Sequence, residues 1–140
     1  MGAVDFGEWA APALQLTFGG RVYEVQPPTV DAAAQIMAAA VRGEVALGLV
    51  PGPVPDEVAR VLAGIGDGHP ALGDVYGQLA GDGVPQATID RMAYYAVFFW
   101  ARGAQYADTL ARLLWAAPTG GEAVPAPKGL SQQKIGRRMG

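Results

Sequence analysis

A glycine pair between two short apolar segments constrains the fold of this chain more than any other feature. Residues 14–18 and 21–25 alternate apolar with polar side chains on either side of Gly19-Gly20. Glycine adopts the positive φ angles of a tight two-residue turn without steric cost. The pattern therefore predicts a β-hairpin over residues 14–25.

One face of this hairpin is expected to be apolar. A two-residue loop places Leu16 opposite Tyr23 and Leu14 opposite Val25, so that these side chains and that of Phe18 lie on the same side. Two strands alone are barely stable in water. The apolar side of the hairpin must therefore rest on helices.

Helical periodicity dominates the rest of the chain up to residue 116. Thr29 follows Pro27-Pro28 and is a typical N-cap for a helix that ends near Gly43. The Pro- and Gly-rich residues 44–55 predict a loop. Further helices are expected over 56–65, 72–79, from Pro85 to about 102, and from there to Trp115 after a break at Gly103. The apolar face of the first helix would consist of Ala33, Ile36, Met37, Ala40 and Val41.

The 140 residues fit one domain, and an apolar share of 51% is ample for a core. The predicted fold is mainly α with a small N-terminal β-hairpin, in which the hairpin covers a compact bundle of about five helices. Residues 1–116 would form this single globular domain. Residues 117–140 lack periodicity and contain Pro, Gly and basic side chains, so they are expected to form a disordered, flexible tail.

The charge of the chain is unevenly distributed. Residues 1–116 hold six arginines against twelve carboxylates, a net charge of −6, and residues 117–140 hold four basic residues against one carboxylate, a net charge of +3. The acidic body argues against general nucleic-acid binding. A small regulator that binds nucleic acid through its basic tail remains an open alternative.

The residues do not support an enzyme. No cysteine is present, which excludes thiolate nucleophiles and metal sites built on thiolates, and the single histidine, His69, lies in a Gly/Pro turn. The only serine, Ser131, lies in the predicted tail, where no base could be held beside it. We therefore expect no catalytic residue, cofactor or metal.

Two further features bear on localisation. The longest apolar run, Met92–Ala101, is far shorter than the ~20 residues that span a bilayer. The acidic N-terminus lacks the basic region of a signal peptide. A cytosolic protein is expected.

The helix predicted over residues 85–102 carries large side chains on two faces. Ile89, Ala93, Ala96, Val97 and Trp100 form one face, and Arg91, Tyr94, Tyr95, Phe98 and Arg102 form the other. Either the helix is central and both faces are covered within the domain, or the second face binds a partner, since aromatic residues and arginine are enriched at binding hot spots. Trp115, off the leucine stripe of the last helix, raises the same question. The candidate partner-binding residues are Arg91, Tyr94, Tyr95, Phe98, Arg102 and Trp115.

Several motifs together indicate a family. Residues 12–29 combine the Gly-Gly hairpin, a proline pair and a capped helix, and they are followed by Leu-Gly-Asp-Val-Tyr at 72–76, Asp-Gly-Val at 82–84 and the aromatic helix that ends near Gly103. In their order and spacing these motifs resemble tail assembly chaperones of long-tailed, siphovirus-type actinobacterial phages, over about residues 5–116. The chain departs from that pattern at 44–55, which is unusually rich in proline and glycine.

The resemblance implies a function in viral tail assembly. Such chaperones bind the long helical tape-measure protein, keep it soluble while tail-tube subunits assemble around it, and leave before the virion is finished. They have no catalytic residues. The resemblance further implies a location in the host cytoplasm, a possible contact with the tail-tube protein, and a longer form of the chain made by ribosomal frameshifting. A structural virion protein, such as a tail-completion or connector subunit, is the main alternative.

Overall fold

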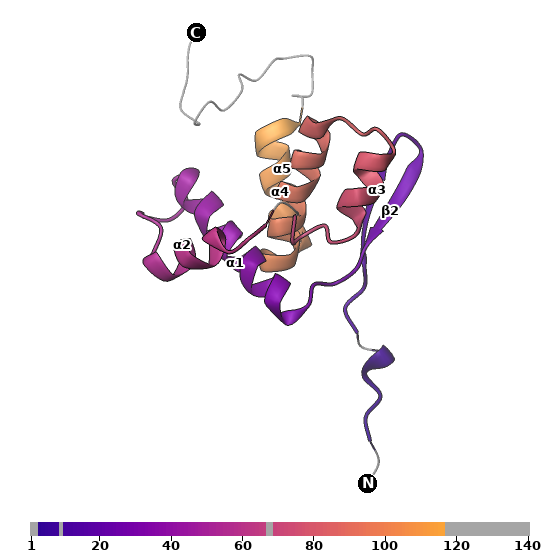
Figure 1. Cartoon of the computed structure of the whole chain (residues 1–140), viewed down its shortest axis with the longest axis horizontal. Helices are drawn as coiled ribbons and strands as arrows, with labels where there is room; N and C mark the ends of the chain where they lie inside the picture. Colours follow the sequence, from indigo (N-terminus) through magenta and orange to yellow (C-terminus); the bar gives the residue numbers. More distant parts are fainter. Residues whose placement is uncertain (1–2, 9, 67–68, 117–140) are drawn as a thin grey trace.

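A computed structural model of the chain describes residues 3–8, 10–66 and 69–116 (Figure 1). It confirms a mainly helical fold with an N-terminal β-hairpin; residues 117–140, the predicted tail, lie outside the described residues. In chain order the elements are the 3-10 turn η1 (Phe6–Glu8), the strands β1 (Leu14–Phe18) and β2 (Arg21–Val25), and the helices α1 (Val30–Ala46), α2 (Asp56–Ala63), α3 (Val75–Gly81), α4 (Gln86–Arg102) and α5 (Ala104–Trp115).

The hairpin forms as its sequence predicts. β1 and β2 pair antiparallel with Leu16 opposite Tyr23 and Leu14 opposite Val25. Both turn glycines have positive φ angles, 62° and 80°. On the apolar face Leu14, Tyr23 and Val25 are buried and Leu16 is half-buried, whereas Phe18 beside the turn is 41% exposed. Phe18 therefore lies on the predicted face, but at the end of it that the helices cover least.

Helix α4 is the centre of the domain. The hairpin and α3 lie on one side of it, and α1 and α2 lie on the other, with α5 alongside (Figure 1). Two core clusters form on α4. One joins its residues Ile89, Ala93 and Ala96 to the hairpin and to α3, and the second joins Phe98 to α1 and α5.

Helix α1 does not end near Gly43 as expected but continues to Ala46. A Cβ atom at Gly43 would lie only 3.0 Å from Cζ of Phe98. The glycine thus permits close packing of α1 on α4 and is not a stop signal. The buried face of α1 also differs from the prediction, because Ala33 and Met37 are exposed, and it consists of Ile36, Ala38, Ala40, Gly43 and Glu44.

The helix predicted over residues 72–79 begins later, at Val75, and runs to Gly81. Gly73 has a φ of 55°, a left-handed conformation that an α-helix cannot contain. Leu72 is buried in the turn before the helix, and the carbonyl oxygen of Ala71 accepts a hydrogen bond from Nε1 of Trp100 (3.1 Å).

The remaining boundaries lie close to the prediction. α2 ends at Ala63, and α4 begins directly after Pro85. The predicted break at Gly103 is present, because this residue has a φ of 102° and alone separates α4 from α5. Within the described part of the chain, no helix has the length and apolar character needed to cross a membrane.

Candidate functional site

The six residues predicted to bind a partner do not form one surface. Phe98 is only 1% exposed and packs in the second core cluster with Ala40, Ala107 and Leu110. A partner cannot reach this side chain in the folded domain, so the expectation that Phe98 lies on a binding face is corrected. The cause is the close approach of α1 at Gly43, which covers this part of α4.

Tyr94, Trp115 and Arg91 form a row beside this core. Tyr94 is half-buried and meets Phe98 and Trp115 edge to face, with ring centroids 5.2 Å and 5.8 Å apart. The guanidinium of Arg91 lies over the Trp115 ring, 5.4 Å from its centroid. Burial raises the pKa of Tyr94. These contacts anchor the end of α5 to the first half of α4.

Tyr95 is half-buried, because its side chain lies between α4 and α5. Its hydroxyl donates a hydrogen bond to Oδ1 of Asp108 on α5, and its ring stacks on that of Phe99. Burial, followed by the hydrogen bond and charge of Asp108, raises the pKa of Tyr95 to about 12. The side chain therefore helps to hold the two helices together.

Arg102 is bound to a residue that the sequence analysis placed in a loop. Its Nε donates to Oε2 of Glu44 (2.9 Å), and its Nη2 donates to Oε1 of the same carboxylate (2.8 Å). The hydroxyl of Tyr106 donates to Oε2 (2.8 Å). Glu44 is only 5% exposed, and the hydrogen bond from Arg102 is the main cause that lowers the pKa of its carboxyl group.

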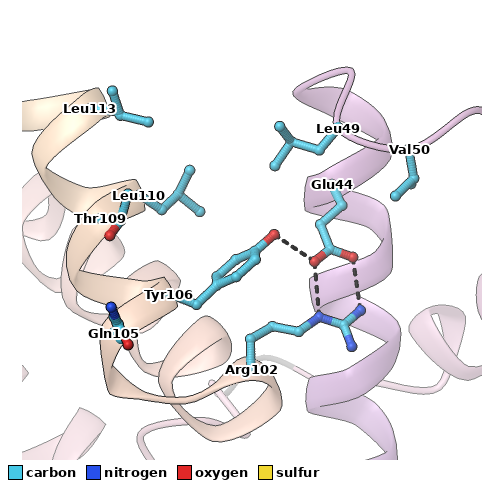
Figure 2. Close-up of a pocket in the computed structure, with 9 residues that line it drawn as sticks. All are labelled: Glu44, Leu49, Val50, Arg102, Gln105, Tyr106, Thr109, Leu110 and Leu113. Atoms are coloured by element: carbon cyan, nitrogen blue, oxygen red, sulfur yellow. Dashed lines mark hydrogen bonds and ion pairs between the residues drawn. The ribbon is translucent and has the colours of Figure 1, made fainter.

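An open groove of about 880 Å³ lies above this charged cluster, between the end of α1 and the helix α5 (Figure 2). Leu49 and Val50, which follow α1, lie on one side, and Leu110 and Leu113 of α5 lie on the other. We call this feature the α1–α5 groove; its lining residues are Glu44, Leu49, Val50, Arg102, Gln105, Tyr106, Thr109, Leu110 and Leu113.

The groove is apolar where it is most accessible. Leu113 is 70% exposed and Leu49 is 54% exposed, so that large aliphatic side chains face solvent on both walls. The two charged residues that line the groove, Glu44 and Arg102, are paired with each other. Such a site can bury an apolar surface of a partner without leaving a charged side chain of the groove unpaired.

Of the residues that line this groove, Arg102 alone is among the partner-binding residues predicted from the sequence. The leucine stripe of α5, formed by Leu110, Leu113 and Leu114, gave a signal, because Leu110 is buried whereas Leu113 is exposed. The sequence around Glu44 contains no signal of its role, because its partner Arg102 is 58 positions away in the chain. Among the described residues, no cluster of three or more histidine or acidic side chains could hold a metal ion.

Comparison with known proteins gives a family but no activity. No curated protein and no solved structure matches the chain. One family model, described as a domain of unknown function (DUF7426), matches residues 4–138, nearly the whole chain. The chain belongs to this family, the domain of unknown function DUF7426.

Proposed function

We propose that this chain is a phage tail assembly chaperone that binds the tape-measure protein and keeps it soluble while the tail tube assembles. Two independent observations support the proposal. The motifs of residues 12–29, 72–76 and 82–84 resemble those of such chaperones. The domain also carries an accessible apolar groove, and the exposed leucines on its two walls are the observation on which the proposal depends most.

The groove suits an amphipathic helix. A helix presents apolar side chains at positions i, i+3, i+4 and i+7, and proteins commonly bind such a stripe in an apolar groove. Leu49 and Leu113 would contact this stripe from opposite sides. Complete burial of an exposed leucine stabilises a complex by about 1.5–3 kcal/mol, so two leucines suffice to distinguish an apolar stripe from a polar helix face.

Co-expression with the tape-measure protein tests this function. The variant Leu49→Ser with Leu113→Ser should strongly decrease the soluble fraction of the tape-measure protein. Val4→Ser with Val22→Ser is the matched control, because these valines are 61% and 55% exposed and do not line the groove. Circular dichroism should show that both variants retain the fold. An undiminished soluble fraction with the groove variant would contradict the proposal.

Mass spectrometry of purified virions distinguishes the proposal from its main alternative. A chaperone leaves before the particle is complete, so its peptides should be absent from purified virions that contain the tape-measure and tail-tube proteins. Stoichiometric amounts of this chain in the particle would instead assign it to the structural virion proteins, such as a tail-completion or connector subunit.

A further inference from the structure

The α1–α5 groove ends close to the end of the described chain. Leu113, an exposed residue of its wall, precedes Ala116, the last described residue, by less than one helical turn. Another 24 residues, 117–140, follow in the sequence. We propose that this C-terminal segment binds in the α1–α5 groove of its own chain and competes there with a partner.

The segment is long enough to do so. Along α5 the groove extends from Gln105 to Leu113, about 12 Å at the helical rise of ~1.5 Å per residue. An extended chain covers about 3.3 Å per residue, so 24 residues can reach about 80 Å. The segment can therefore reverse direction after α5 and still cover the whole groove with residues to spare.

The composition of the segment fits the groove and the domain around it. Val124, Leu130 and Ile135 supply large apolar side chains that can contact the exposed leucines of the walls. The segment has a net charge of +3 and residues 1–116 have a net charge of −6, so the charges of the two parts attract each other. Apolar contact would hold the segment in the groove, and the opposite charge would keep it close to the domain.

Covalent linkage makes a weak contact sufficient. A segment that is covalently joined to the domain close to its site is present there at an effective concentration on the order of millimolar. A contact with a Kd of about 1 mM would then fill the groove for roughly half of the time. A partner must displace the segment to bind. Its apparent Kd for the groove is therefore the intrinsic Kd divided by the fraction of grooves that are empty.

Paramagnetic labelling tests the inference on the full chain. Because the chain contains no cysteine, Ser131→Cys creates a single site for a nitroxide label within the segment. In ¹H–¹⁵N spectra the label should broaden the amide signals of Leu49, Leu110 and Leu113 much more than that of Val22 on the outer face of the hairpin. Equal broadening of the groove and hairpin signals would overturn the proposal.

Two controls make the result specific. Leu130→Ser with Ile135→Ser in the labelled chain should abolish the preferential broadening, whereas Leu130→Met with Ile135→Val should retain it. A mixture of labelled ¹⁴N chain and unlabelled ¹⁵N chain should show no broadening of the groove signals. Broadening in this mixture would assign the occupant to a second copy and overturn the proposal.

The inference concerns the same groove as the proposed function but does not depend on it. The labelling experiment contains no tape-measure protein, so segment docking can be found even if co-expression shows no chaperone activity. Conversely, a groove that binds the tape-measure protein but never its own C-terminal segment would leave the proposed function intact and remove only this inference.

Discussion

Arg102 and Glu44 join α4 to α1 through two parallel hydrogen bonds of 2.9 Å and 2.8 Å. The fork of the guanidinium matches both carboxylate oxygens, and this geometry gives the strongest type of side-chain ion pair. The hydroxyl of Tyr106 adds a third hydrogen bond from α5. A single buried carboxylate thus connects three helices below the α1–α5 groove.

Removal of the arginine should destabilise the domain. In Arg102→Ala the carboxylate of Glu44 stays buried with only Tyr106 as a donor, and an uncompensated buried charge is costly. Because Arg102 is partly exposed, water can replace some of its hydrogen bonds, and we expect a loss of about 2–3 kcal/mol. Urea unfolding measures this loss. Arg60→Ala on α2 is the control, and a similar loss for both variants would contradict the prediction.

The same ion pair should make the domain sensitive to acid. The pKa of Glu44 lies below its ordinary value of 4.5, so the folded state binds the proton less readily than the unfolded state. Its contribution to stability is complete above pH 4.5 and is lost as the pH falls through the lowered pKa. Urea unfolding as a function of pH should show this decrease, and Glu44→Gln should show a smaller one. An identical acid dependence in Glu44→Gln would show that other carboxylates are responsible.

Gly43 and Gly77 should respond in opposite ways to alanine. Alanine favours a helix over glycine by up to about 1 kcal/mol. At Gly43, however, the new Cβ would lie 3.0 Å from the ring of Phe98, which is confined in the core and cannot yield. We expect Gly43→Ala to lose about 1 kcal/mol of unfolding free energy despite its better helix propensity.

Gly77, inside α3, is the matched control for this experiment. A Cβ at this position would meet no atom within 4 Å, so Gly77→Ala should gain about 0.5–1 kcal/mol. Thermal or urea unfolding of the two variants provides the comparison. A stabilised Gly43→Ala protein would show that α1 and α4 can move apart without cost.

Tyr95 should titrate well above an exposed tyrosine. Its pKa is about 12, raised by burial and by Asp108, so its phenol should remain protonated when exposed phenols ionise near pH 10. The stability that Tyr95 contributes is therefore complete below pH 10 and is lost as the pH rises toward 12. The difference in phenolate absorbance between the wild type and Tyr95→Phe isolates this group. Asp108→Asn should lower the pKa only in part, because burial remains.

The fold could be predicted from sequence where local chemistry decides it. The glycine pair and the alternating strands determine the register of the hairpin, and Thr29 caps α1 with its side chain, as expected. Glycines elsewhere were ambiguous. Gly43 lies inside a helix because it contacts Phe98, whereas Gly73 has a positive φ and precedes α3. The difference depends on distant residues, which local patterns do not contain.

The candidate site was harder to predict for the same reason. The two faces of α4 were recognised, but which aromatic side chains are covered depends on how closely α1 and α5 approach. Phe98 is covered by α1, and Tyr95 is held by Asp108. The α1–α5 groove combines residues from two stretches that are far apart in the chain, 44–50 and 102–113, and no single amphipathic pattern predicts it.

The pairing of Glu44 with Arg102 has a consequence for specificity. Among the described residues, the two charged side chains that line the α1–α5 groove neutralise each other, so the groove presents mainly apolar side chains and no unpaired charge to a partner. Such a surface discriminates poorly between one apolar helix stripe and another. In the proposed function, such tolerance would let this domain bind successive, unrelated stretches of a long helical protein.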